Sequence, residues 1–230
     1  MTAEAPDVAI VVAGGVIPDR AAIDAAWPGW GDGRCLVVAA DGGAIGAAQL
    51  GLEVDELVGD LDSIAPDRLA ALQAADVAIE TWPRDKDASD TELAVRAALR
   101  HRPGRIVILG ALGGLRPDHA LANVGLLGLA ELVGSDVNLL DGSSRTRLVC
   151  GPAEVTLAGR VGDLVSLLPI AGDVGAVGTD GLAYSLADEP LLAGSTRGLS
   201  NVRITSTARI RVAAGRLLVV EVIADPEVLS

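Results

Sequence analysis

Aromatic residues are almost missing from this chain of 230 residues. They make up 2% of the sequence, and phenylalanine does not occur at all. Apolar residues nevertheless amount to 50%, which is ample for a hydrophobic core. The core must therefore be built from Val, Leu, Ile and Ala. This palette favours close-packed α/β layers, in which β-branched strands lie beneath Ala- and Leu-rich helices.

Excess positive charge and long apolar runs are lacking as well. The net charge of −13 argues against a nucleic acid or an anionic membrane as the main partner, because both would be repelled over most of the surface. No uncharged apolar run reaches the length of about 18 residues that spans a bilayer. Residues 1–7 lack the basic start and apolar block of a secretory signal. We therefore expect a soluble, cytoplasmic protein.

Familiar catalytic signatures are also absent. The sequence contains neither a GxxxxGK[ST] loop nor a GxGxxG fingerprint. It has no HExxH, GxSxG or CxxC motif, and Cys35 and Cys150 lie far apart with no histidine near either, so disulfide and zinc roles are not expected. If this chain is an enzyme that acts on phosphate groups, it must bind them with a different loop.

Strand-like and helix-like segments alternate in the first part of the chain. The expected strands cover residues 8–13, 35–40, 57–58, 77–81, 106–109 and 137–140. The expected helices cover residues 21–26, 44–50, 67–74, 90–100 and 119–132. Repeated βα units predict an α/β domain with a mainly parallel, doubly wound sheet.

The pattern changes after about Gly142 to short alternating segments broken by glycine. The clearest of these cover residues 154–157, 164–168, 202–204, 208–212 and 217–223. Such segments are typical of an antiparallel all-β sandwich. The sequence therefore predicts an α/β domain at residues 1–142 followed by a β-sandwich domain at residues 143–230.

The only lysine, Lys86, lies in the most acidic stretch of the chain, residues 84–92. A compact cation among carboxylates suggests chemistry that combines a phosphate with a metal. Ser89 with Glu92 fits a helix capping box, which is a purely structural explanation. That explanation does not cover Asp87 and Asp90, whose mutual repulsion a metal with a phosphate would relieve.

Four polar or glycine-rich loops follow expected strands, at residues 41–44, 59–63, 86–92 and 110–119. In open parallel sheets the carboxyl ends of the strands form the ligand site, so we expect these loops to meet at one edge. Asp60 and Asp62 offer oxygen ligands for Mg²⁺, although a solvated turn also explains them. Arg116 can grip a phosphate. Asp118 could instead be only a helix cap and His119 only a core histidine.

Taken in order, these loops resemble the thiamine pyrophosphokinase family, whose members transfer diphosphate from ATP to thiamine. The matching segments are DGGA at 41–44, GDLDS at 59–63, KDASDTE at 86–92 and GALGGLRPDHALAN at 110–123. The resemblance continues with GLAYSL at 181–186 and GSTRGLSN at 194–201. It implies an ATP-binding catalytic α/β domain, a β-sandwich that binds thiamine and mediates dimerisation, and a homodimer with sites at the subunit interface.

The resemblance also implies roles for individual residues. The implied Mg²⁺ ligands are Asp60, Asp62, Asp87 and Asp90. The implied contacts to ATP and its phosphates are Asp41, Gly42, Gly43, Lys86, Arg116, Asp118 and His119. The implied contacts to thiamine are Tyr184, Ser200 and Asn201. Asp62, Asp90 and Lys86 are expected to carry catalysis, with Asp90 or Asp62 as a candidate general base.

Three other functions remain open from the residues alone. A DxD-type, Mg²⁺-dependent phosphatase would use Asp60 as a covalent nucleophile. A related diphosphotransferase acting on a pterin or another alcohol would share the acidic loops. A non-catalytic nucleotide sensor would bind ATP without producing AMP.

Overall fold

The computed structural model describes residues 4–224 and divides the chain after Gly142 into two compact units. Within the described residues, no helix is both long and apolar enough to cross a bilayer.

The first unit alternates strands and helices. Its strands are β1 (Val8–Val12), β2 (Cys35–Ala40), β3 (Glu56–Gly59), β4 (Ala78–Thr81), β5 (Arg105–Leu109) and β6 (Asp136–Asp141). Its helices are α1 (Arg20–Ala26), α2 (Gly43–Gln49), α3 (Pro66–Ala74), α4 (Asp90–Arg100), α5 (Pro117–Leu126) and the short 3₁₀ helix η1 (Ala130–Leu132).

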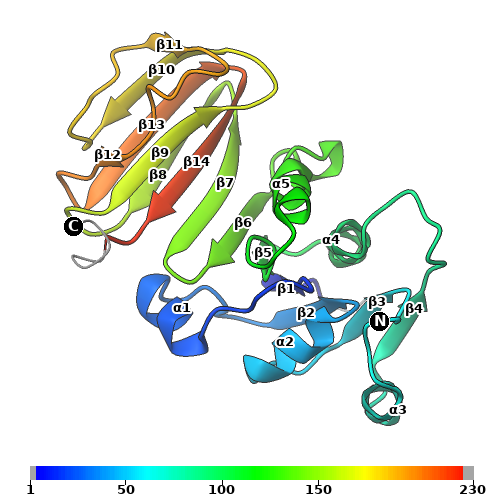
Figure 1. The fold of residues 1–230 in the computed structure, drawn as a ribbon. Coiled ribbons are helices and arrows are strands. Elements are labelled where there is room, and N and C mark those ends of the chain that lie inside the picture. The colour runs from blue at the N-terminus through cyan, green and yellow to red at the C-terminus, as the bar shows by residue number, and fades with distance from the viewer. Residues whose placement is uncertain (1–3, 225–230) are drawn as a thin grey trace. The chain divides into compact units, whose positions relative to one another are not determined.

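These six strands are parallel, in the order β6-β5-β1-β2-β3-β4. Helices α1, α2 and α3 cover one face of the sheet, and α4 and α5 cover the other (Figure 1). The chain moves outward from β1 to β4 and then returns to place β5 on the other side of β1. The strand order therefore reverses between β1 and β5, which is where doubly wound sheets open a ligand crevice.

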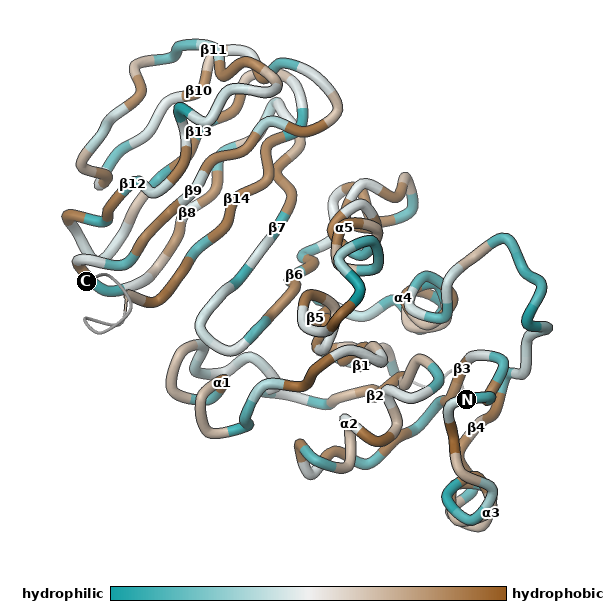
Figure 2. Tube along the Cα trace, in the orientation of Figure 1, coloured by the Kyte–Doolittle hydropathy of each residue, from teal (hydrophilic) through white to brown (hydrophobic). Residues whose placement is uncertain are grey.

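Burial explains the sequence of this sheet. All five residues of β1 are buried, as a strand covered on both faces requires. Figure 2 shows hydrophobic colour along such strands and teal at the loops that connect them. Helix α4 begins where expected because the Ser89 side chain accepts a hydrogen bond from the backbone N–H of Glu92, at 3.2 Å.

The second unit is a sandwich of two antiparallel sheets. One sheet has the order β12-β9-β14-β7 and the other has the order β11-β10-β13-β8. The strands are β7 (Ser144–Cys150), β8 (Ala153–Ala158), β9 (Leu164–Pro169), β10 (Val174–Asp180), β11 (Glu189–Leu191), β12 (Asn201–Val202), β13 (Thr207–Ala214) and β14 (Arg216–Val222). Both sheets contribute to one apolar core, for example Leu167 from β9 and Ile210 from β13.

The predicted fold class, a parallel α/β domain followed by an antiparallel sandwich, is confirmed. The continuous helix expected at residues 119–132 is wrong, because α5 ends at Leu126 and only η1 follows. Gly125 and Gly128 explain the break, since glycine weakens a helix interior. Strands β7, β10 and β11 were not among the clearest predicted segments.

Candidate functional site

A cavity of about 500 Å³ opens at the carboxyl edge of the parallel sheet. Loops that follow five strands, β1 to β5, line it, and they include the loops on either side of the point where the strand order reverses. The main polar and glycine residues of the lining are Gly14, Gly15, Asp41, Gly42, Asp60, Asp62, Arg84, Lys86, Asp90, Gly110, Gly113, Arg116, His119 and Asn123.

Glycines bring two of these loops into close backbone contact. The N–H of Gly15, after β1, donates to the carbonyl of Gly110, after β5, at 3.0 Å. A Cβ on Gly15 would overlap the carbonyl oxygens of Gly110 and Gly113. The amide of Asn123 on α5 fixes the same region by donating to the carbonyl of Ala111 at 2.8 Å. The result is a backbone-lined wall that a phosphate can approach closely.

Three carboxylates meet inside the cavity. One oxygen of each of Asp41, Asp60 and Asp62 lies within 4.8 Å of the others. Asp41 is only 8% exposed, and its Oδ1 has no hydrogen-bond partner among the described residues. An uncompensated buried carboxylate is costly, and a divalent cation removes that cost. The donor set is all oxygen, so the residues present fit Mg²⁺.

Gly59 lets a fourth carboxylate approach this group. It ends β3 with φ +151, and a Cβ there would lie 3.0 Å both from the Cβ of Asp41 and from Oδ1 of Asp90. A side chain at position 59 would therefore push Asp41 and Asp90 apart. The glycine of the GDLDS segment is explained by this close packing.

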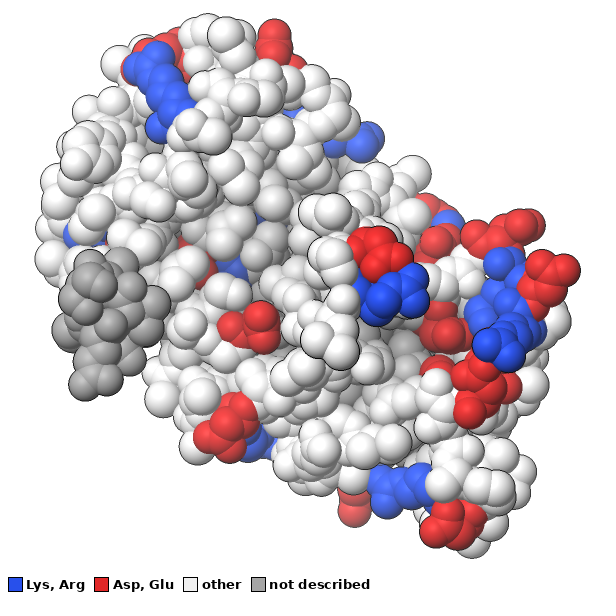
Figure 3. All heavy atoms as spheres, in the orientation of Figure 1, with Lys and Arg blue, Asp and Glu red and all other residues white. Residues whose placement is uncertain are grey.

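Lys86 is ion-paired within the acidic group. Its Nζ lies 3.2 Å from Asp60 Oδ2 and 3.0 Å from Asp90 Oδ1, and its side chain is 9% exposed. Burial would lower the pKa of Lys86, but the contacts with Asp90 and Asp60 and the negative charges of these two carboxylates together outweigh burial and raise it. The backbone N–H of Asp62, and after it Lys86, lower the pKa of Asp60. Figure 3 shows charges of both signs on the side of the first unit where β4 and the loop into α4 lie.

Arg116 lines the cavity but is paired with Asp118 at the start of α5. Its Nε lies 2.9 Å from Asp118 Oδ1, and a second nitrogen lies 2.5 Å from Oδ2. The hydrogen bond from Arg116 lowers the pKa of Asp118 to about 2. His119 lines the cavity, whereas Asp118 is not among the lining residues. The bonds to Asp118 engage two of the three guanidinium nitrogens of Arg116, so this side chain is already ion-paired where it lines the cavity.

The other predicted site residues of this unit differ in whether they line the cavity. Gly42 lines the cavity, but Gly43 packs α2 against β1, because a Cβ there would overlap the carbonyl oxygen of Val12. Asp87 is exposed and is not among the residues that line the cavity. Its role as a metal ligand stays a prediction.

In the second unit, the three residues implied for thiamine lie on adjoining backbone. The side chain of Asn201 holds Tyr184 through two hydrogen bonds: Oδ1 accepts from the Tyr184 N–H at 3.0 Å, and Nδ2 donates to its carbonyl at 2.7 Å. The N–H of Ser200 donates to Ser166 Oγ at 3.0 Å. Tyr184 is 72% exposed, so its ring is available for stacking, while Asn201 is buried.

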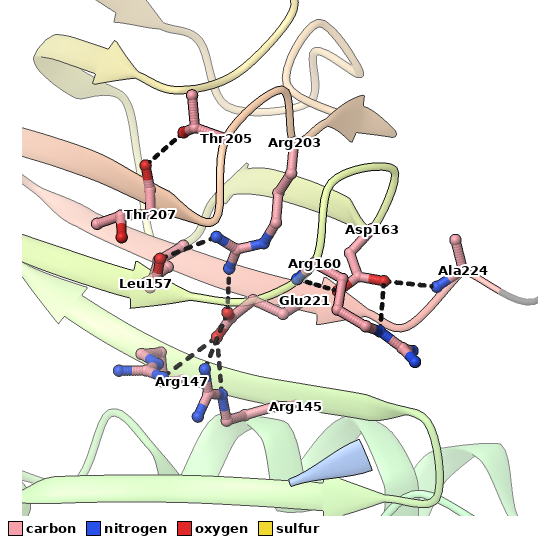
Figure 4. Close-up of polar contacts among 10 residues, drawn as sticks. All are labelled: Arg145, Arg147, Leu157, Arg160, Asp163, Arg203, Thr205, Thr207, Glu221 and Ala224. Carbon is pink, nitrogen blue, oxygen red and sulfur yellow. Dashed lines mark hydrogen bonds and ion pairs between the residues drawn. The ribbon is translucent and has the colours of Figure 1, made fainter. Parts of the chain in front are cut away.

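A buried ion cluster lies close in sequence to Asn201 and is centred on Glu221 (Figure 4). Arg203, two residues after Asn201 and 1% exposed, donates to Glu221 on β14 at 2.5 Å and to the carbonyl of Leu157 at 2.9 Å. Glu221 also accepts from Arg145 at 2.7 and 2.9 Å and from Arg147 at 3.2 Å. Figure 4 shows Glu221 between Arg203 on one side and the two β7 arginines on the other.

Sequence reasoning missed Gly14, Gly15, Arg84 and the Arg203–Glu221 cluster. The two glycines had a readable signal, because they directly follow the apolar run of β1 as the other site loops follow their strands. Arg84, whose Nε lies 3.7 Å from Asp62 Oδ2, adjoins the stretch around Lys86. The ion cluster had no local signal, because its members are far apart in sequence.

Two family models match the chain in order. The model described as the catalytic domain of thiamin pyrophosphokinase matches residues 32–136, and the model of its vitamin B1 binding domain matches residues 154–217. The thiamine pyrophosphokinase of Bacillus subtilis is 28% identical over 214 residues, which cover 91% of this chain and 96% of that protein.

Solved structures agree with these matches. The structure of the Bacillus subtilis enzyme has a TM-score of 0.82 at 26% identity and covers 95% of this chain and 100% of its own. That of the Geobacillus thermodenitrificans enzyme has a TM-score of 0.79 at 25% identity, with coverages of 95% and 99%. The yeast enzyme, at 15% identity and a TM-score of 0.73, covers 96% of this chain and 88% of its own and shares the fold.

Proposed function

The chain belongs to the thiamine pyrophosphokinase family, and from this membership we infer that it transfers the diphosphate group of ATP to the hydroxyl of thiamine, giving thiamine diphosphate and AMP. One observation carries the inference in this chain. The cavity at the carboxyl edge joins a glycine-lined wall, three clustered carboxylates and the only lysine of the chain. Such a site suits a polyphosphate that arrives with a divalent cation.

We propose that Asp41, Asp60 and Asp62 hold Mg²⁺. The ion, when bound, neutralises charge on the transferred diphosphate. Asp41 stands here as a metal ligand and no longer as a direct contact to phosphate, since a bare carboxylate repels phosphate oxygens. Asp90 supports the site through Lys86, to which it is paired at 3.0 Å.

The remaining chemistry is positioning. The thiamine hydroxyl attacks the β-phosphorus of ATP, and AMP leaves. We propose that Lys86 and Arg116 contact the phosphate oxygens. Gly42 and the loop at residues 110–114 let the backbone approach the same oxygens. Asp62 or Asp90 takes the proton of the thiamine hydroxyl. His119, which lines the cavity, and its neighbour Asp118 are proposed to contact the nucleotide.

The second unit is proposed to bind thiamine through Tyr184 and Ser200. Asn201 then acts by holding the backbone of Tyr184, and its own amide is already engaged. The exposed side chains of Tyr184, Leu199 and Ile204 support a homodimer in which this region meets a second copy, because such apolar residues are often covered in assemblies. Light scattering on the purified protein tests the dimer. We also propose that the protein is cytoplasmic, as expected from the sequence.

The other functions are not favoured. A phosphatase with Asp60 as nucleophile does not use the vitamin B1 binding domain that the second family model matches. The same match speaks against a pterin substrate.

The test is to incubate the purified protein with ATP, Mg²⁺ and thiamine and to identify the products by mass. Thiamine diphosphate with AMP in equal amounts is expected. ADP, free phosphate or an unchanged mixture would reject the function. ATP binding without turnover would identify a nucleotide sensor.

The metal assignment predicts a large effect of Asp62→Asn. Loss of one charged ligand should lower turnover by several orders of magnitude, because the charge on the diphosphate is then less well neutralised. Asp85→Asn changes an aspartate of the acidic stretch 84–92 that does not line the cavity, so it is the matched control and should keep most activity. Near-normal turnover of Asp62→Asn at saturating Mg²⁺ would contradict the assignment.

A further inference from the structure

The ammonium group of Lys86 lies beside the carboxylates that are proposed to bind Mg²⁺. Its Nζ contacts Asp60 Oδ2 at 3.2 Å and Asp90 Oδ1 at 3.0 Å. Both contacts lie on the wall of the cavity, and the lysine side chain is 9% exposed. The ammonium group is thus already a counter-ion to two carboxylates of the site.

Asp60 is shared between this pair and the carboxylate group with Asp41 and Asp62. The unpartnered, buried Oδ1 of Asp41 independently points to a cation in that group. A divalent ion bound there draws on the same carboxylate as Lys86. The ion also carries the same sign of charge as Lys86, so the two repel each other.

The formal charges of the site balance with one divalent ion. The carboxylates of Asp41, Asp60, Asp62 and Asp90 contribute −4, and Lys86 and Arg84 contribute +2, which leaves −2. Without Lys86 the deficit would be −3. The lysine therefore weakens the attraction of the nucleotide-free site for a metal.

We propose that Lys86 is an exchangeable internal counter-ion that competes with the divalent cation for Asp60 until a polyphosphate binds and takes over the ammonium group. The inference rests on the proposed function for the identity of the polyphosphate. Its consequence is that metal and nucleotide favour each other's binding, since each relieves the conflict that the other meets. The free protein is thereby kept from filling its site with metal alone.

The experiment measures Mg²⁺ binding to the nucleotide-free protein by isothermal titration calorimetry. K86Q should bind Mg²⁺ about tenfold more tightly than the wild type, because one positive charge a few ångströms from a divalent ion is worth about a power of ten in affinity near water. K86R keeps the charge and should bind as the wild type does. R84Q removes a cation that is 86% exposed, and should change the affinity less than about threefold.

Unchanged or weaker Mg²⁺ binding by K86Q would overturn the proposal, as would the absence of Mg²⁺ binding by every variant. Circular dichroism checks folding, and K86M, another uncharged side chain of similar length, serves if K86Q does not fold. Loss of fold in both would make Lys86 a structural residue and would also overturn the exchange. If the wild-type protein makes no thiamine diphosphate but K86Q still binds Mg²⁺ more tightly than the wild type, the proposed function is rejected. The competition between Lys86 and the divalent cation is then still supported.

Discussion

Replacing Glu221 with glutamine tests the buried ion cluster of the second unit. Glu221 is 2% exposed and accepts hydrogen bonds from Arg145, Arg147 and Arg203. Glutamine keeps the volume and one acceptor oxygen, but it removes the only negative charge among these four side chains. The guanidinium group of Arg203, which is 1% exposed, then loses the carboxylate with which it is paired.

The structure sets the size of the effect. Breaking a buried pair by removing one partner costs about 3–5 kcal/mol. In a unit of fewer than 100 residues, each kcal/mol lowers the melting temperature by about 4 °C or more. Glu221→Gln should therefore lower the melting temperature of the second unit by at least about 12 °C.

The distribution of aromatic residues makes this assay selective. Trp27, Trp30 and Trp82 all lie in the first unit, so tryptophan fluorescence follows that unit, while far-ultraviolet circular dichroism follows both. We expect an early transition by circular dichroism in Glu221→Gln, before the tryptophan signal changes. Arg211→Gln, which removes an exposed pair with Asp180, is the control and should cost less than about 1 kcal/mol. A cost below about 1 kcal/mol for Glu221→Gln would refute the reasoning.

Two further predictions concern the first unit. Gly43→Ala should lower the free energy of unfolding by several kcal/mol, because the new Cβ would overlap the backbone carbonyl of Val12. Gly125→Ala is the control, because its new Cβ meets nothing within 4 Å and the free energy of unfolding should stay the same or rise. Equal free energies of unfolding for the two variants in urea titrations would contradict this prediction. Arg116→Gln should return the pKa of Asp118 from about 2 toward 3.8, followed by carbon-13 shifts of the carboxyl group. Because the pKa of Asp118 is lower in the folded protein, the Arg116–Asp118 contact stabilises the protein above about pH 4, and this stabilisation is lost as the pH falls toward 2. An unchanged pKa of Asp118 in Arg116→Gln would exclude Arg116 as the cause.

The elements that the sequence predicted well carry local signals. The strand at residues 35–40 and the helix at residues 90–100 have the predicted bounds, the first because it is a continuous apolar run and the second because Ser89 caps it. Strand β7 was less readable, because its Arg145 and Arg147 turn toward the buried Glu221 and interrupt the apolar pattern. Its polarity makes sense only once β14 lies beside it.

The same distinction holds for the site. The order of the polar loops predicted which edge of the sheet would hold it, since strand ends in a parallel sheet share one edge. The pairing of Lys86 with Asp60 and Asp90, and of Arg116 with Asp118, could not be predicted. These contacts depend on side-chain directions that only the packed structure fixes.

The solitary lysine has a practical consequence. A chain grown with lysine labelled by nitrogen-15 at the ε position carries one labelled ammonium group, and that group lies on the cavity wall. Its single resonance needs no assignment and belongs to a side chain shielded from solvent. The arrival of a ligand in the cavity can therefore be followed at an atom of the cavity wall, without altering any residue of the protein.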